Sequence, residues 1–296
     1  MARKILDKAL KDAYPVTINA SSKIIMFSDL HKGDNNYADD FAHNMLLYRH
    51  AMTEYYENDY TYIELGDGVE LWENYSFAPI YIAYEGIFEL LKKFYDQDRM
   101  YMLWGNHDMI FSDPLMVEKV LYNIFPPKNR VQKEQLFDLK YHEGILLKIE
   151  GTNKQILLIH GHQADWFNYR LWKVSRFFVR YFWMPLQNWF KLKDPTSPAK
   201  NYKTLLRVEN KLKDWMLENN NQMVIAGHTH RPRFPDPGLL PYFNDGSCVH
   251  PDSIIGLEIE NLEIKMVKWH YDFDPDNEKK IVKTVLAGPQ PLEAYL

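Results

Sequence analysis

An aspartate and a histidine two residues apart follow the first strongly apolar run of the chain. The run Ile24 to Phe27 predicts a β-strand, and Asp29 and His31 come shortly after it. Side chains at positions i and i+2 of an extended chain point to the same face, so we expect the Asp29 carboxylate and the His31 imidazole to meet just beyond the strand. A carboxylate beside an imidazole suits a divalent ion such as Mn²⁺, Fe²⁺, Zn²⁺ or Co²⁺ better than Ca²⁺ or Mg²⁺.

Four further apolar runs end in a residue that can bind a metal, each beside a glycine. Glycine permits a sharp exit from a strand and a close approach of the backbone to an ion. A single run of this kind is explained by a buried strand that ends in a polar turn, but five in order predict one shared metal site. The four runs end in Gly66-Asp67, Gly105-Asn106-His107-Asp108, His160-Gly161-His162 and Gly227-His228-Thr229-His230.

The ordered set D-X-H, GD, GNHD, HGH and GHTH resembles the signature of the calcineurin-like metallophosphoesterase superfamily, over about residues 23 to 270. The resemblance implies an α/β fold, a four-layer α-β-β-α sandwich of two mixed sheets with a helical cap insertion. It also implies two divalent metal ions, with Asp67 as the bridge between them. Asp29, His31 and His230 would hold the first ion, and Asn106, His160 and His228 would hold the second.

The same resemblance assigns His107 as a general acid or a residue that contacts the phosphate, and Glu70 as the residue that orients it. Glu70 would fix the tautomer of the imidazole and keep it protonated. We expect manganese, with iron or zinc as alternatives, and hydrolysis of a phosphate ester or anhydride, because a pair of divalent ions activates water and neutralises phosphoryl oxygens. His162 has two interpretations, a metal ligand or a residue that lines the cleft.

The composition limits the kind of protein. The chain has 296 residues and one cysteine, Cys248, so it can bury a large core but cannot form an internal disulfide, and a reducing cytoplasmic location is the default. The first residues lack the apolar segment of a signal peptide, and no apolar run approaches the about 20 residues of a spanning helix. The net charge of −5 argues against a broad nucleic-acid-binding surface. We expect a cytoplasmic protein, with association at the inner face of the membrane as one alternative, that binds a phosphate-containing small molecule or lipid.

Alternating strand and helix patterns predict the layers. Apolar spacing favours helices over 38–56 and 80–95, between strands at 24–27, 60–65 and 100–104, and this order implies a sheet with helices on its faces. We expect one domain over 1–296, a short helix near 5–14, and a run over the surface at 271–296. Period-two patterns predict a second sheet from strands at 136–141, 145–149, 155–159, 240–243, 253–259 and 262–269.

Residues 163–222 form a predicted helical cap inserted in this domain. Between Trp166 and Lys193 there are 11 aromatic residues, 6 basic residues and no acidic residue. A basic helix rich in Trp and Phe suits a membrane interface or an amphiphilic ligand, so peripheral membrane contact through 166–193 is one interpretation. In two alternatives these residues contact a soluble phosphate-bearing substrate or a partner subunit, or they pack on the sandwich. The candidate substrate contacts of the cap, spaced along one helical face, are Arg170, Lys173, Arg176 and Arg180.

Three stretches resemble a subgroup, the UDP-2,3-diacylglucosamine diphosphatases, which carry a helical acyl-chain lid at this place. The sequence differs from that subgroup at His107, where the subgroup has arginine, and at His162, where it has aspartate. The alternative is a generic phosphomonoesterase or phosphodiesterase with a soluble substrate, such as a protein phosphatase or a nucleotide phosphodiesterase. A non-catalytic scaffold is disfavoured because the ligand set is complete. The three stretches are Gly66-Asp-X-X-Glu70-X-Trp72, His160-Gly-X-Gln163-X-Asp165 and Gly227-His-Thr-His-Arg231-Pro232.

Overall fold

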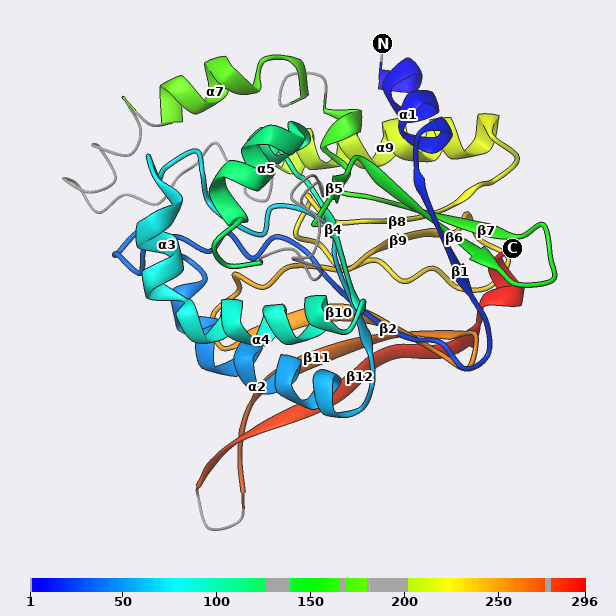
Figure 1. Ribbon diagram of the computed structural model, residues 1–296. Helices are drawn as coiled ribbons and strands as arrows, with labels where there is room; N and C mark the ends of the chain where they lie inside the picture. The colour runs from blue at the N-terminus through cyan, green and yellow to red at the C-terminus, as the bar shows by residue number, and fades with distance from the viewer. Residues whose placement is uncertain (1, 126–138, 166–168, 180, 182–201, 275–277) are drawn as a thin grey trace, which may run out of the picture.

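Two mixed β-sheets pack face to face in the computed structural model (Figure 1), which describes residues 2–125, 139–165, 169–179, 181, 202–274 and 278–296. One sheet has the strand order β1-β6-β7-β8-β9, and the other has the order β12-β11-β10-β2-β3-β4-β5. The strands of the first sheet are β1 Tyr14–Ile18, β6 Gly144–Ile149, β7 Gln155–Ile159, β8 Met223–Ala226 and β9 Tyr242–Asn244. The strands of the second are β2 Lys23–Phe27, β3 Thr61–Glu64, β4 Met100–Leu103, β5 Tyr141–His142, β10 Ser253–Glu260, β11 Glu263–Phe273 and β12 Lys279–Pro291.

Helices cover the outer face of each sheet, which confirms the four-layer sandwich (Figure 1). α1 (Ala2–Lys11) and α9 (Tyr202–Glu218) lie on the five-stranded sheet. α2 (Met45–Glu57) and α4 (Glu85–Asp96) lie on the seven-stranded sheet. The shorter helices are α3 (Phe77–Ala83), α5 (Pro114–Leu121) and α7 (Trp172–Phe178).

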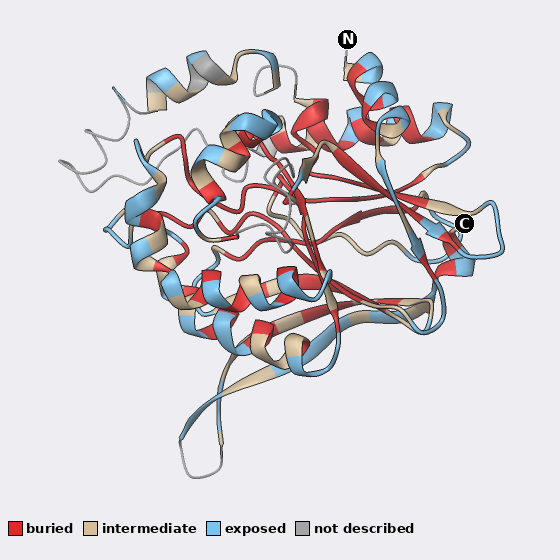
Figure 2. Cartoon of the chain, viewed as in Figure 1, coloured by how far each residue is buried: buried red, intermediate tan, exposed pale blue. Residues whose placement is uncertain are grey.

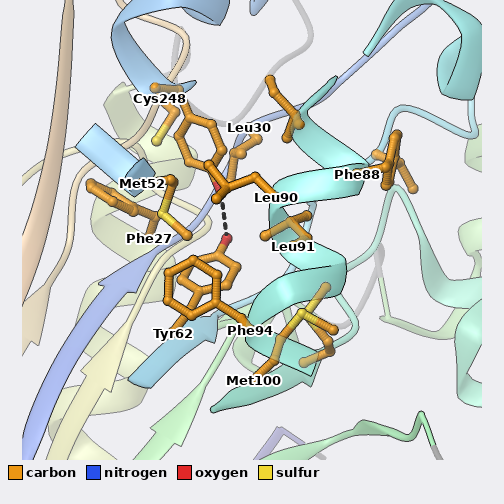
Figure 3. Close-up of a cluster of buried hydrophobic side chains, with 14 of the residues drawn as sticks. Phe27, Leu30, Met52, Tyr62, Phe88, Leu90, Leu91, Phe94, Met100 and Cys248 are labelled. Carbon is orange, nitrogen blue, oxygen red and sulfur yellow. Dashed lines mark hydrogen bonds between the residues drawn. The ribbon is translucent and has the colours of Figure 1, made fainter. Parts of the chain in front are cut away.

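Three apolar clusters fill the three spaces between these layers. Ile63 and Leu158 belong to the cluster between the two sheets, and Phe27 and Phe94 belong to the cluster under α2 and α4 (Figure 3). Trp215 of α9 is fully buried in the third cluster, against the five-stranded sheet and α1. Burial of such surface stabilises the fold by about 25 cal/mol per Å². The central strands are therefore buried on both faces, as Figure 2 shows, which explains their nearly continuous apolar sequences.

Local sequence signals set where the helices beside the metal motifs begin. The Asp113 side chain accepts a hydrogen bond from the backbone N–H of Leu115 at 3.0 Å, and Pro114 occupies the first turn of α5. Both features are favourable at a helix N-terminus. The Ser76 hydroxyl caps α3 in the same way by accepting from the N–H of Ala78. These caps hold α3 and α5 just downstream of the Asp67 and Asn106 loops.

The two ends of the chain differ from the sequence prediction. The expected helix near 5–14 is α1, which ends at Lys11, and strand β1 follows it. The surface run expected at 271–296 is wrong, because Lys279–Pro291 forms the long edge strand β12, antiparallel to β11. Most β12 side chains are exposed or half-buried, so backbone pairing rather than an alternating buried face defines this strand. The period-two pattern that reveals inner strands is therefore absent from it.

Part of the predicted cap is described. α7 and α9 lie within 163–222, and α9 packs on the five-stranded sheet as part of the outer layer. Arg180, the side chain of Lys173 and residues 182–201 lie outside the described residues. None of the helices in the described part of the chain has the length and apolar character needed to cross a membrane.

Candidate metal centre

The candidate ligands follow the carboxyl ends of strands from both sheets. β2, β3 and β4 are parallel neighbours in the seven-stranded sheet, and Asp29, Asp67 and Asn106 come shortly after their last residues. β7 and β8 are parallel neighbours in the five-stranded sheet, and His160 and His228 follow them. Because parallel strands end at the same edge of a sheet, each sheet delivers its own group of ligands to one side. The site lies where these two edges meet.

Five candidate ligands have a left-handed backbone. The φ angles are 51° at Asp29, 49° at His31, 52° at Asp67, 66° at His228 and 53° at His230. An L residue in this region costs about 1–2 kcal/mol, and such residues cluster at functional sites. The sequence argument for Asp29 and His31 assumed an extended chain, and this assumption is wrong. Their side chains do converge, but through two left-handed turns rather than through the alternation of a strand.

Backbone hydrogen bonds join the first two ligand loops. The N–H of Asp29 donates to the carbonyl of Gly66 at 3.1 Å, and the N–H of His31 donates to the carbonyl of Asp67 at 2.9 Å. A Cβ atom on Gly105 would lie 2.1 Å from Oδ1 of Asp67. The glycine at position 105 therefore permits the third loop to touch the Asp67 carboxylate.

Three groups of side chains each bring their ligand atoms within 4.8 Å of one another. Asp67 belongs to two of these groups. Its Oδ2 lies 3.1 Å from Nε2 of His160 and 3.8 Å from Nε2 of His31. Oδ1 of Asp29 lies 3.0 Å from Nε2 of His230. The groups are Asp29, His31 and His230; His31, Asp67 and His107; and Asp67, His160 and His228.

The donor atoms fit divalent cations. Metal bonds to oxygen and nitrogen of about 2.1 Å place neighbouring ligand atoms about 3.0 to 3.4 Å apart, close to the separations observed here. Within the described part of the chain, five candidate ligand atoms are buried and have no hydrogen-bond partner. Buried polar atoms are rarely left in this state unless an ion binds them. These atoms are Oδ1 of Asp29, Nε2 of His31, Oδ1 of Asn106, Nε2 of His160 and Nε2 of His228.

His162 is outside all three groups. The side chain is fully buried, and its ring packs beside His160 at 5.3 Å and stacks on Tyr169 at 5.6 Å between centroids. Neither ring nitrogen has a hydrogen-bond partner among the described residues. The structure therefore places His162 beside His160 and His228 but in none of the three groups of ligand atoms.

A family profile described as calcineurin-like phosphoesterase matches residues 22–232, which is more than half of the chain. The chain belongs to the calcineurin-like phosphoesterase family. The profile ends just after His230, so it spans all seven candidate ligands of this phosphoesterase. Comparison with curated proteins finds no match.

Solved structures similar to this phosphoesterase have low sequence identity. A conserved uncharacterized protein from Streptococcus pneumoniae TIGR4, a predicted phosphoesterase, has 14% identity and a TM-score of 0.35, over 89% of this chain and 98% of that chain. Wild-type Vps29 from Entamoeba histolytica, complexed with Zn²⁺, has 14% identity and a TM-score of 0.38, over 89% and 98%. A putative 5'-nucleotidase from Staphylococcus aureus has 15% identity and a TM-score of 0.37, over 89% of this chain and 53% of that chain.

Glu70 contacts two histidines of the phosphoesterase site. Its Oε2 lies 3.0 Å from Nδ1 of His31 and 2.7 Å from Nδ1 of His107. The Trp72 ring stacks on a face of the His107 ring, with centroids 4.2 Å apart and planes tilted by 19°. The expected contact between Glu70 and His107 is thus present, while the contact between Glu70 and His31 was not expected. One carboxylate orients both imidazoles and directs each Nε2 away from Glu70.

Sequence reasoning missed two residues that support Asp29. The Ser28 hydroxyl lies 2.5 Å from Oδ2 of Asp29 and 2.7 Å from Oδ1 of Asp245, and all three side chains are buried. The N–H of His228 also donates to Oδ2 of Asp29 at 2.8 Å, which leaves Oδ1 as the atom that faces the other ligands. Asp245 directly follows β9.

A second missed pair lies under the loops. The Lys32 side chain is 1% exposed, and its Nζ lies 3.2 Å from Oε2 of the buried Glu64. Glu64 also accepts a hydrogen bond from the hydroxyl of Tyr62 at 2.9 Å. A buried lysine is rare unless it is paired, so a lysine directly after a metal motif was the available signal. The pair holds the backbone of the Asp29 loop on the end of β3.

The carboxylates of the centre differ in protonation. Burial favours the neutral form of Asp67, but the nearby His160 and His107 outweigh it and hold the pKa of Asp67 well below its usual range. Burial also favours the neutral form of Glu70, but the nearby His107 outweighs it, and the pKa of Glu70 is lowered to about 2. Burial and the charge of Asp67 raise the pKa of Asp108 to about 7. Asp67 and Glu70 are therefore ionised at neutral pH, the form in which a carboxylate binds a cation.

Asp108 joins two of the ligand loops. Its carboxylate accepts hydrogen bonds from the N–H of Gly68 at 2.8 Å and from the N–H of Gly105 at 2.6 Å. The two N–H groups belong to the loops that carry Asp67 and Asn106, so Asp108 supports the site by connecting these loops.

Proposed function

We propose that this phosphoesterase hydrolyses a phosphate ester or anhydride with two divalent cations bridged by Asp67. The position of Asp67 carries the proposal, because its carboxylate shares one ligand group with His31 and another with His160 and His228. A carboxylate with a lowered pKa between two histidine groups has the geometry of a bridging ligand.

The remaining ligands divide between two subsites. We assign Asp29, His31 and His230 to one subsite, and Asn106, His160 and His228 to the other, in support of the assignment from the sequence motifs. All seven donors are oxygen or nitrogen, so we propose Mn²⁺ as the native ion, with iron or zinc as alternatives. When bound, such a pair supplies Lewis acidity and lowers the pKa of water toward neutrality.

The chain itself supplies the proposed acid and the residues that orient it. Glu70 and Trp72 hold the His107 ring from two sides, so Nε2 is the ring atom available to a leaving-group oxygen. We propose that His107 donates a hydrogen bond or a proton there, as the general acid. His31 receives the same orientation from Glu70, so one carboxylate couples the acid to the ligand set.

Asp67→Asn tests the bridge. We expect the wild-type protein to bind two Mn²⁺ ions and to hydrolyse p-nitrophenyl phosphate or its methyl diester, since both have a good leaving group. The variant should bind at most one ion and lose activity by about 100-fold or more, because a misplaced reacting group costs rate steeply. Metal content is measured by mass spectrometry and turnover by nitrophenolate release.

The matched control for this test is Asp59→Asn, which changes a carboxylate that is 88% exposed and lies away from the ligands. This control should keep both ions and full activity. An Asp67→Asn protein that kept two ions and the wild-type rate would overturn the proposed function.

The finer assignments are also proposals. We propose one domain over 1–296 in which 163–222 is an inserted cap, with Arg170 and Arg176 among its substrate contacts, and a cytoplasmic protein that associates with the inner face of the membrane. The stretches shared with UDP-2,3-diacylglucosamine diphosphatases favour a lipid-linked phosphate. His107 in place of arginine favours a broader phosphoesterase with a soluble substrate. Turnover of UDP-2,3-diacylglucosamine compared with p-nitrophenyl phosphate distinguishes the two.

A further inference from the structure

A groove of about 630 Å³ lies between α3, α5 and the residue Arg176 of α7. Its volume falls within the about 300–1,000 Å³ of small-molecule sites. Apolar side chains from three segments line it, among them Leu71, Phe77, Ile110 and Val120. A groove of this composition suits an apolar chain or ring rather than a sugar or a nucleotide base.

The groove adjoins the loop that carries Glu70 and Trp72. Leu71 lines its wall and stands between Glu70, which contacts His107, and Trp72, which stacks on the His107 ring. Ile110 lines the groove three residues after His107. The Glu70 loop therefore has the candidate metal centre on one side and the groove on the other, and a ligand that spans this loop would place its phosphate in the first and a connected group in the second.

The surface around the groove is unusually apolar. Leu115 of α5 is 73% exposed, Tyr75 before α3 is 64% exposed and Phe177 of α7 is 51% exposed. Figure 1 places α3, α5 and α7 on the same side of the molecule. Grouped exposed apolar side chains mark binding surfaces on soluble proteins. Lys119 and Arg176 add positive charge to the groove lining, which suits a ligand that is also an anion.

We infer that the groove binds the apolar part of the substrate, so that the substrate is an amphiphilic phosphate ester or anhydride with an alkyl or aryl group. This inference rests on the proposed function. The phosphate reacts beside His107, and the chain lies between α3 and α5. Lys119 and Arg176 attract the anion toward the groove.

The first test varies chain length at constant chemistry. The probes are p-nitrophenyl alkyl phosphodiesters from methyl to decyl, kept below their critical micelle concentrations and assayed with Mn²⁺. All share the nitrophenolate leaving group, so only the retained chain changes. We expect kcat/KM to rise about threefold per added methylene until the groove is filled.

The second test measures binding without turnover. Calorimetry of decylphosphonate and methylphosphonate with the metal-free protein should show tighter binding of the longer chain. Ala78→Trp places a large ring in the groove and should reduce the decyl-to-methyl ratio, of both kcat/KM and binding, to near one. The matched control is Ile82→Trp, on the same helix at a residue that is 75% exposed and does not line the groove, and it should keep the wild-type ratio.

The outcomes separate the two proposals. Turnover of the methyl ester without any gain from chain length overturns the groove and leaves the phosphoesterase assignment intact. Absence of turnover for every ester in protein loaded with two Mn²⁺ ions overturns the proposed function. In that case the phosphonate titration still shows whether the groove binds an alkyl chain. A gain that appears only above the micelle concentration also overturns the groove, because it indicates adsorption to an interface.

Discussion

The Glu70 carboxylate contacts both His31, a candidate metal ligand, and His107, the proposed general acid. Its Oε1 accepts hydrogen bonds from the N–H groups of Trp72 and Glu73, while Oε2 faces His31 and His107. The carboxylate is therefore fixed by the backbone before it contacts either imidazole. Loss of a residue that orients a ligand in this way normally lowers metal affinity or activity by about 10- to 100-fold.

His107→Asn separates catalysis from metal binding. We expect the variant to keep two Mn²⁺ ions and to lose about 100- to 10,000-fold in kcat, the usual contribution of a general acid. Metal content and steady-state rates measured on the same preparation check this. The matched control is His43→Asn, which changes an exposed histidine outside the motifs and should alter neither quantity.

The structure offers a sharp alternative to this expectation. His107 also forms a group with His31 and Asp67 whose ligand atoms could hold an ion. Loss of one Mn²⁺ ion in His107→Asn would show that His107 is a ligand and would refute its role as the acid.

At the scale of elements, the ends of parallel strands position the candidate ligands. β2, β3 and β4 end at successive loops, and those loops touch through glycines, through backbone hydrogen bonds and through hydrogen bonds from backbone N–H groups to Asp67 and Asp108. The distance between loops is therefore set by contacts to the main chain. A single added methyl group at such a contact should change the ligand geometry.

Gly105→Ala tests this contact. The new Cβ would lie 2.1 Å from Oδ1 of Asp67 and 2.6 Å from its backbone nitrogen, so the bridging carboxylate must move. We expect Mn²⁺ binding about 10- to 100-fold weaker by calorimetry, with destabilisation of about 1–3 kcal/mol in urea unfolding.

The control for this prediction is Gly86→Ala in α4. The nearest atom to its new Cβ is 3.5 Å away, on the Arg49 side chain, so the substitution fits the helix. It should leave Mn²⁺ affinity unchanged and stabilise the protein by about 0.5–1 kcal/mol. Equal Mn²⁺ affinity in both variants would contradict the proposed role of Gly105.

At the scale of the molecule, an aromatic contact joins the two sheets. Tyr14 of β1 and His142 of β5 stack with ring centroids 4.4 Å apart, and the two strands belong to different sheets. Burial and, to a smaller extent, the charge of Lys140 lower the pKa of His142 to about 4. The folded protein therefore keeps this ring neutral.

This contact should make stability depend on pH. The unfolded chain binds a proton at His142 below about pH 6.5, whereas the folded chain does so only near pH 4. The free energy of unfolding should fall as the pH is lowered from 6.5 to 4, and the fall should be smaller in His142→Asn. Urea unfolding across this range checks the difference. Parallel curves for the two proteins would count against the burial of this ring in solution.

The sequence by itself predicted the candidate ligands and the positions of most inner strands. It was wrong in grouping the strands at 253–259 and 262–269 with that at 155–159, because β10 and β11 lie beside β2 in the seven-stranded sheet. Asp29, Asp67 and Asn106 were predictable as a group because a buried apolar strand must end at a polar turn, and parallel neighbours end at one edge. The helical character of 163–222 was also predictable, and its described part contains α7 and α9. These features depend on residues close together in the chain.

Only the tertiary structure decided how the two sheets complete the site. Ser28 meets Asp245 across 217 positions, and Glu70 meets His31 across 39, through loops whose left-handed turns no periodicity reveals. β12 was missed because its exposed side chains leave only backbone pairing to define it. The groove likewise needs α3, α5 and Arg176 in place together. Contacts between distant residues depend on how whole layers pack, because local sequence constrains the strand ends but not the distance between two sheets.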